Sequence, residues 1–351
     1  MNSAYPSQIA ALPVDSLVSL MRNAGYSPRE GVIMAVEQLT FGCSFSGDES
    51  GDIVEFARRA EALGFDRVTT GEHLMDGNPP RPTLLGIPAM AAASGATRNI
   101  RIMTGIVIVP LYHPVMLAKL VATVDVISGG RLDFGIGISG QRGTKVEFDA
   151  VGVSVRTRGR RTNEMLQVMK RLWTEEGVSH QGDFFKFDDV TLLPHPVQKP
   201  HPPIWVSGRS DAAMQRAALL GDGWYPYLFT VGRLRRSNET IRRLAGEAGR
   251  DLTGFHWGLN QPTSIMEDRE KALAQAVDNV GQRYVTADRS AEDIARALCV
   301  TGTADDCVEA IEERTDAGVR DFNFSFLAPD TAQMYEQMEM FAREVMPRFR
   351  D

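Results

Sequence analysis

The chain has 351 residues, a formal net charge of −7 and the composition of an ordinary globular protein. No apolar run approaches the roughly 20 residues that a membrane-spanning helix requires, and the acidic balance disfavours nucleic acid and anionic membranes as partners. The three cysteines, Cys43, Cys299 and Cys307, lack the spacing of a metal site, so we expect reduced thiols in a cytoplasmic protein.

Regular strand and helix patterns begin only near Leu39. Residues 1–33 carry proline, serine and charged residues without the central apolar stretch of a signal peptide. We therefore interpret residues 1–33 as an N-terminal extension with little ordered structure, and residues 34–351 as one folded domain. The elements predicted in the first part of this domain are a strand at Leu39–Phe45, a helix at Asp52–Leu63, a strand at Arg67–Gly71 and a helix at about Leu84–Ser94.

Residues 101–137 contain a complete β-α-β unit. The continuous apolar run from Ile102 to Val109 predicts a strand that is buried on both faces. Pro114 suits the first turn of a helix, which carries an apolar stripe and ends at Gly129. Leu132–Ile136 then begins the next buried strand.

The second half of the chain continues this alternation, except at residues 177–203, which are rich in proline and too long for a plain connection. The elements predicted there are a helix at Gly159–Trp173, a strand at Ile204–Ser207, a helix at Asp211–Leu220, strands at Gly223–Pro226 and Phe255–Ser264 around a helix at Val231–Gly246, helices at 267–281, 290–299 and Thr303–Ala317, a strand at Asp321–Phe326 and a helix at Thr331–Pro347. The count is close to eight strands, each followed by a helix. We therefore predict an α/β fold, a single (β/α)8 TIM-type barrel with an insertion between helix 4 and strand 5; a doubly wound open sheet is the alternative.

Active sites of such barrels lie at the carboxyl ends of the strands, and Ser207-Gly208-Arg209-Ser210 occupies one of these ends. Small residues between a buried strand and a helix expose backbone N–H groups, and the helix N-terminus adds partial positive charge. This pattern predicts a phosphate site. The alternative is that Ser210 only caps the following helix. The chain contains neither a P-loop nor a dinucleotide-binding fingerprint.

Two further strand ends carry candidate residues. The glycines between Gly135 and Gly140 permit a planar ring to approach the backbone closely, or simply let the strand bend. His73 follows a strand and Glu72, where a neutral imidazole can donate a hydrogen bond or move a proton near neutral pH; a structural histidine is the alternative. The chain has no metal-ligating histidine motif and no nucleophile elbow, so we expect no metal site.

A set of short stretches occurs at characteristic spacings along the chain. They are Ala62–Asp66, Gly71-Glu72-His73, Thr104-Gly105-Ile106, His113-Pro114 through Ser128–Leu132, Pro203–Gly208 and Gly221–Trp224. As an ordered set, covering about residues 34–348, they resemble the bacterial luciferase-like flavin monooxygenase superfamily, including its branch that uses the deazaflavin coenzyme F420.

The resemblance implies a barrel that binds FMN or F420 at the carboxyl ends of its strands. Gly105 and Ile106 would be joined by a cis peptide behind the cofactor ring, and Gly137 would lie near the ring. His73 would face the reactive edge, and the loop Gly208–Ser210 would bind the phosphate. The candidate catalytic residue is thus His73, and the candidate cofactor-binding residues are Thr104, Gly105, Ile106, Gly137, Ser139, Ser207, Gly208, Arg209 and Ser210.

The resemblance also implies a flavin-dependent oxidoreductase. Our first hypothesis is a monooxygenase that takes reduced FMN from a separate reductase and uses O2 to oxidise a small organic substrate. The alternative is hydride transfer with F420, fed by an F420 reductase, although that branch often has aspartate where this chain has Glu72. More remote alternatives are a flavin-binding protein without turnover and a metal-dependent barrel hydrolase. We expect a homodimer.

Overall fold

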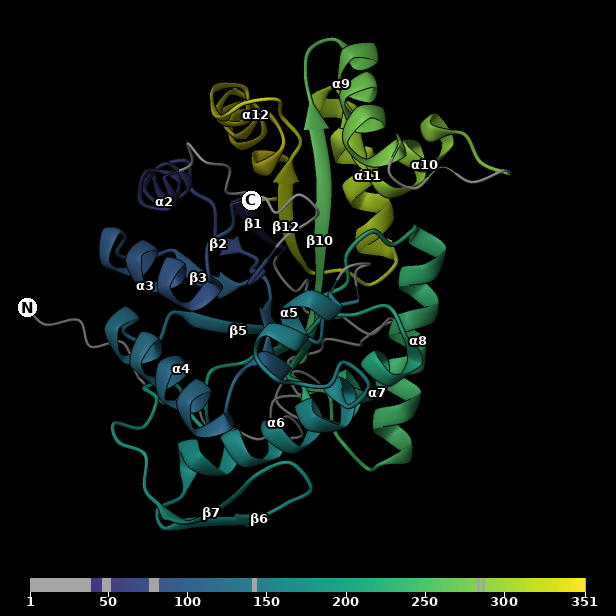
Figure 1. The fold of residues 1–351 in the computed structure, drawn as a ribbon. Helices are drawn as coiled ribbons and strands as arrows, with labels where there is room; N and C mark the ends of the chain where they lie inside the picture. The colour runs from purple at the N-terminus through teal and green to yellow at the C-terminus, as the bar shows by residue number, and fades with distance from the viewer. Residues whose placement is uncertain are drawn as a thin grey trace, which may run out of the picture. The chain divides into compact units, whose positions relative to one another are not determined.

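The computed structural model describes residues 39–45, 52–75, 82–140, 144–282, 285 and 288–350. Residues 1–33, which we interpret from the sequence as an extension, lie outside these ranges. Within the described residues, strands and helices alternate along the chain, and the helices surround the strands (Figure 1). None of these helices combines the length and the apolar character that crossing a membrane requires.

The strands of the described chain form a closed parallel barrel of eight positions. These are β1 (Thr40–Phe45), β2 (Arg67–Thr70), β3 (Arg101–Thr104) with β4 (Val107–Ile108), β5 (Leu132–Gly137), β8 (Ile204–Val206), β9 (Gly223–Trp224), β10 (His256–Ile265) and β12 (Asp321–Phe326). Strand β9 pairs with both β8 and β10, and β12 pairs with both β10 and β1. The sheet therefore closes on itself. The predicted TIM-type barrel is confirmed, and the open-sheet alternative is wrong.

Except for the short α5 (Lys145–Ala150), which contacts the residues after β2 through Glu147, the helices cover the outside of the barrel. The covering helices are α2 (Ile53–Ala62), α3 (Gly86–Ala96), α4 (Pro114–Ser128), α6 (Arg158–Thr174), α7 (Asp211–Leu220), α8 (Val231–Glu247), α9 (Arg269–Ala276), α10 (Ala291–Leu298), α11 (Ala304–Asp316) and α12 (Thr331–Glu344). Shorter helical turns are Val109–Leu111, Val277–Gly281 and Met346–Phe349. A short strand, β11 (Val300–Gly302), pairs with β10 outside the barrel order.

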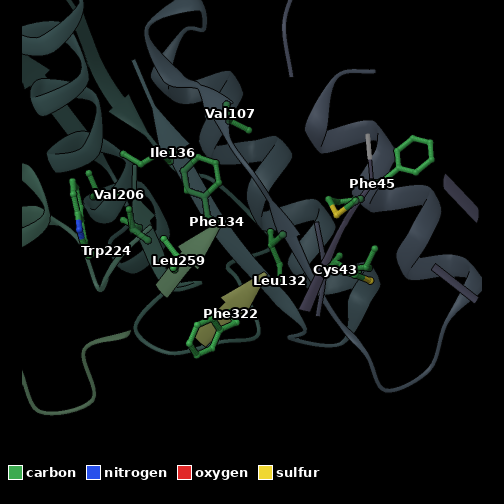
Figure 2. Packing of buried hydrophobic residues seen from close by; sticks show 14 of the residues in the cluster. Cys43, Phe45, Val107, Leu132, Phe134, Ile136, Val206, Trp224, Leu259 and Phe322 are labelled. Carbon is green, nitrogen blue, oxygen red and sulfur yellow. The ribbon is translucent and has the colours of Figure 1, made fainter. Parts of the chain in front are cut away.

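Alternate residues of each strand point outward and pack against these helices. Figure 2 shows Phe134, Ile136 and Val206 within this buried layer. The indole of Trp173 on α6 meets Phe134 edge to face, with 6.2 Å between ring centroids. On the opposite side of the barrel, Phe341 of α12 packs against the strand β12. Because the outward positions are apolar, the inward positions of the same strands are free to carry other chemistry.

The strand predicted from Ile102 to Val109 is not continuous. The apolar run from Ile102 to Val109 is two strands, because β3 ends at Thr104 and β4 begins at Val107. The Gly105–Ile106 peptide between them is cis, as the resemblance implied. Strands β3 and β4 both pair with β5, so together they occupy one position of the barrel. The interruption changes the direction of the chain without adding a position.

Residues 177–203 lie between α6 and β8 and contain an antiparallel hairpin. Its strands are β6 (Val178–Gln181) and β7 (Lys186–Val190), which are joined by a turn at residues 182–185. The hairpin is fixed to α6 by Glu164, which accepts hydrogen bonds from the backbone N–H groups of Phe184 and Phe185. It therefore packs on the outer wall, not inside the barrel.

Candidate active site

The carboxyl ends of neighbouring barrel strands carry glycine where a side chain would point inward. A Cβ on Gly71 would lie 3.1 Å from the carbonyl oxygen of Gly105, and a Cβ on Gly137 would lie 2.6 Å from the Cδ1 of Ile106. The ends of β2, β3 and β5 therefore meet as bare backbone. Gly105 and Ile106 remain half-exposed even though the strands that lead to them are buried.

Ile106 forms part of the surface at this end. Its side chain packs on Met103, Trp205 and Tyr225, which are buried inside the barrel. A Cβ on Gly105 would lie 2.0 Å from the hydroxyl oxygen of Thr69, so the backbone at Gly105 rests directly on that hydroxyl. Only glycine fits this position without a rearrangement of the strand beneath it.

A polar layer lies immediately below Gly105. The hydroxyls of Ser44 and Thr69 and the side-chain oxygen of Asn323 gather about the hydroxyl of Tyr225, and burial raises the pKa of that phenol. None of these four oxygens has a hydrogen-bond partner of good geometry among the described residues. Buried oxygens of this kind are satisfied by ordered water or by a polar group of a bound molecule.

Thr104 and Ser139 flank the glycines in sequence, but their side chains are engaged elsewhere. Thr104 is 1% exposed, and its hydroxyl donates to the carbonyl oxygen of Gly135 at 2.8 Å. Ser139 has a left-handed backbone (φ 53°), shares a hydrogen bond with the hydroxyl of Thr144, and accepts one from Arg158 through its carbonyl. The structure thus brings Gly105, Ile106 and Gly137 together but leaves these two hydroxyls committed to protein partners.

The loop between β8 and α7 lies at an adjacent strand end. Ser210 caps α7 by accepting a hydrogen bond from the N–H of Ala213, so its capping role is present whatever else it does. Gly208 has φ 153°, and a Cβ there would lie 2.5 Å from that of Ala213. The guanidinium of Arg233 donates a hydrogen bond to the backbone carbonyl of the exposed Arg209, which brings this cation to the loop that precedes α7. Burial lowers the pKa of Arg233, and the positive charges of Arg209 and Arg236 lower it further.

His73 follows β2 and is held by a buried carboxylate from a distant helix. Its Nδ1 is 3.0 Å from the Oε1 of Glu147 on α5, whose side chain is 4% exposed. The other oxygen of Glu147 accepts hydrogen bonds from the N–H groups of Leu74 and Met75. The hydroxyl of Thr83 donates to the carbonyl oxygen of His73. Glu147 is not evident from the sequence, because it lies 74 residues from His73 on a helix of only six residues.

Glu72, the residue before His73, is a structural brace. Its carboxylate accepts hydrogen bonds from the N–H groups of Gly86 and Ile108 and from the hydroxyl of Tyr112. Burial raises the pKa of Glu72, and these donors offset part of that effect. One carboxylate thereby joins the end of β2 to the start of α3 and to β4. Sequence reasoning noted Glu72 only as a departure from the F420 branch and missed this role.

Charged side chains fill the interior at the opposite end of the barrel, where the strands begin. Arg67 contacts the carboxylates of Asp133 at 2.8 Å and Asp321 at 3.5 Å, and Arg101 binds Asp133 from a second side. Burial alone would raise the pKa of Asp133, but the two guanidinium groups outweigh it and lower this pKa to about 2. The side chain of Arg67 also lies over the ring of Trp205.

These observations test whether a flavin-type cofactor fits the chain. Bare backbone over three strand ends suits the face of a flat ring, and unpartnered oxygens below it suit a polar ring edge. The cationic loop at the N-terminus of α7 suits an anionic tail. The described residues hold no group of three or more histidine, cysteine, aspartate or glutamate side chains that could bind a metal ion.

Comparison with known proteins agrees with the family resemblance found in the sequence. A family model described as luciferase-like monooxygenase matches residues 34–321. The oxygenase component of a flavin-dependent trigonelline monooxygenase from Acinetobacter baylyi is 28% identical over 335 residues, covering 85% of this chain and 89% of that protein. An F420-dependent glucose-6-phosphate dehydrogenase from Segniliparus rotundus is also 28% identical, over 333 residues, covering 85% and 94%. The crystal structure of a monooxygenase from Streptomyces bottropensis is similar with a TM-score of 0.72 at 27% identity, covering 89% of this chain and all of that one.

Proposed function

The chain belongs to the luciferase-like monooxygenase family of oxidoreductases with flavin-type cofactors, and we propose that it is a monooxygenase that uses reduced FMN and O2 on a small organic substrate. One observation carries the proposal. A histidine held by a buried carboxylate stands at the same end of the barrel as bare glycine backbone and a cationic phosphate-type loop. An acid–base group, a ring surface and an anion site are what such a reaction requires of the protein.

The residues divide into two roles. We assign the ring to the surface formed by Gly105, Ile106 and Gly137, and the phosphate to the loop Ser207–Ser210. When bound, reduced FMN supplies the two electrons that reduce one oxygen atom of O2 to water while the other enters the substrate. His73 holds or moves a proton at this reaction. The half-buried Ile106 and the buried Trp205 and Tyr225 below it limit the access of water from inside the barrel.

A separate reductase would supply the reduced cofactor. The Acinetobacter relative is named as an oxygenase component, which supports the same division of labour here. We also place the protein in the cytoplasm, where its three buried cysteines, Cys43, Cys299 and Cys307, would remain the free thiols that the structure contains.

We further propose that the protein is a homodimer through the outer face of α3 and α4. Helix α3 carries no charged residue, and α4 exposes Met116, Val126 and Ile127, with 59%, 38% and 59% of their surfaces accessible. We take these exposed apolar side chains as part of the contact surface, since exposed apolar patches mark protein interfaces. Light scattering after gel filtration should give twice the mass of the chain, and Ile127→Glu should give the monomer.

Hydride transfer with F420 is the second candidate function. It is favoured by the Segniliparus relative, which is as similar as the Acinetobacter protein and is covered over 94% of its length. Titration of the purified protein with FMN and with F420 separates the two. Tight binding of reduced FMN with substrate-dependent O2 uptake supports the monooxygenase, whereas tight binding of F420 alone, without O2 uptake, contradicts it.

His73 provides the direct test of catalysis. His73→Ala should lower turnover by about 100-fold, because general acid–base catalysis contributes a factor of that order. Cofactor affinity should change little, since the ring and the phosphate have other partners. A turnover rate within twofold of the wild type would remove His73 from the reaction.

A further inference from the structure

We infer that Glu147 is a positioning residue, which holds one proton permanently on Nδ1 of His73 so that the proton exchanged in the reaction is the one on Nε2. The inference rests on the proposed function, because it gives His73 a defined acid–base nitrogen. It goes beyond that function by assigning a role to a residue on α5, outside every strand end.

The argument begins with the chemistry of the carboxylate. Both oxygens of Glu147 are occupied, with Oε2 accepting the N–H groups of Leu74 at 2.7 Å and Met75 at 3.3 Å, and Oε1 lying 3.0 Å from Nδ1 of His73. An ionised carboxylate only accepts hydrogen bonds, so Nδ1 must be the donor. The neutral imidazole therefore carries its hydrogen on Nδ1, and Nε2 is the nitrogen that gains or loses a proton.

The second step concerns orientation. Glu147 holds both the ring of His73 and the two residues after it, while Thr83 holds the carbonyl of His73 from another side. The ring is thus fixed from its own peptide and from Nδ1. Partners of this kind set both the tautomer and the angle of a working imidazole, and small errors in its placement reduce rates strongly.

The substitution Glu147→Gln gives a specific consequence. The two backbone N–H groups of Leu74 and Met75 still require an acceptor, so the amide oxygen must take the place of Oε2. The amide nitrogen then faces Nδ1 of His73 as a donor. His73 can satisfy it only by leaving Nδ1 unprotonated and carrying its hydrogen on Nε2. The variant keeps the shape of the site but reverses the tautomer.

The chain contains a matched control. Glu164 on α6 also contacts a histidine and two backbone N–H groups: its Oε1 lies 3.0 Å from Nε2 of His180 and accepts the N–H of Phe185, and its Oε2 accepts the N–H of Phe184. This second pair lies on the β6–β7 hairpin of the outer wall. Glu164→Gln therefore makes the same chemical change in the same kind of hydrogen-bond set, away from the barrel mouth.

The test uses the full chain without cofactor. Protein labelled with 15N histidine is studied by long-range 1H–15N NMR at about pH 9, above the usual imidazole range near 6.5. The resonances of His73 are assigned by their loss in His73→Asn. We expect the Nδ1–H form in the wild type and in Glu164→Gln, and the Nε2–H form in Glu147→Gln. An Nε2–H form of His73 in the wild type overturns the inference, even if Glu147→Gln fails to fold.

Turnover supplies the second measurement. Glu147→Gln should lose about 100-fold in kcat, the order expected for loss of an acid–base group, with cofactor Kd within about twofold of the wild type. Glu164→Gln should retain full turnover, and Glu147→Gln combined with His73→Ala should be no slower than His73→Ala alone. Full turnover in Glu147→Gln with a reversed tautomer overturns the positioning role. If His73→Ala is itself fully active, the catalytic role proposed for His73 fails, while the NMR result on the tautomer still decides whether Glu147 holds the proton on Nδ1.

Discussion

The two ends of the barrel are built from the same strands but with opposite inward residues. Arg67 begins β2 and Gly71 directly follows its end, while Asp133 lies near the start of β5 and Gly137 ends it. These positions are four residues apart, so in each strand they share the inward face. At the amino ends the inward residues form a buried ionic layer, and at the carboxyl ends they leave bare backbone. On the proposed function, stability and cofactor binding depend on different ends of the same strands, and substitutions should separate the two.

The largest effect is expected at the ionic end. Asp133→Ala removes the carboxylate that Arg67 and Arg101 share and leaves Arg67 only Asp321, at 3.5 Å; removing one partner of a buried ion pair destabilises a protein by about 3–5 kcal/mol. Urea unfolding should show this loss of unfolding free energy, while the cofactor affinity of the folded fraction stays at the wild-type value. Weak cofactor binding with normal stability would contradict the separation of the two ends.

The reverse result is expected at Gly137. The new methyl group of Gly137→Ala would displace the end of the flexible Ile106 side chain, so the unfolding free energy should fall by only about 1 kcal/mol. Cofactor affinity should fall by about tenfold or more, equivalent to at least roughly 1.4 kcal/mol, because the ring loses its contact surface. Gly246→Ala is the control, since a Cβ there meets nothing within 4 Å, and it should leave affinity unchanged.

A smaller effect on binding is expected at Ser210. Aspartate caps helices as well as serine does, so Ser210→Asp should leave the unfolding free energy unchanged. Its negative charge beside the proposed phosphate should weaken cofactor binding by about fivefold, a change of roughly 1 kcal/mol. Ser210→Asn, which caps the helix without charge, should bind normally. Equal affinities for the two variants would show that the phosphate lies elsewhere.

The smallest effect concerns pH. The pKa of Asp133 is lowered to about 2, so its contribution to stability is present above the unfolded value near 3.9 and is lost as the pH falls from about 4 to 2. Burial would raise the pKa of Asp321, but His256 and Arg67 lower it overall, which places its loss in the same acid range. Urea midpoints measured between pH 5 and 2 should fall less steeply in Asp133→Asn than in the wild type. Parallel curves would mean that the ionic layer does not control acid stability.

Local patterns were sufficient to predict the fold, because the periodicity of a strand or a helix depends on residues that are close together in the sequence. Helix α7 begins and ends where its capping serine and apolar stripe place it. The break at Gly105 was not visible in periodicity, since the apolar run continues through it, and only the resemblance indicated the cis peptide. Thr104 could have been judged better, because strand alternation sends its side chain opposite to that of Met103.

The site was only partly predictable for a different reason. His73 and the glycines belong to strand ends, which a barrel brings together by its topology. Glu147 and the ionic layer depend on contacts between residues 32 or more positions apart, and such contacts leave no trace in local sequence. Arg67, Asp133 and Asp321 were visible as charges in otherwise apolar strands, but their pairing follows only once the sheet closes.

The brace at Glu72 has a mechanical consequence. Its carboxylate accepts the first N–H group of α3, and its backbone is bonded directly to His73, so a single residue connects the outer wall to the residue that carries the imidazole. A displacement of α3 is therefore transmitted to the strand end that carries the histidine. If two subunits contact each other through α3, a structural change in one subunit is transmitted to His73 of the other, although neither contributes a residue to the other's site.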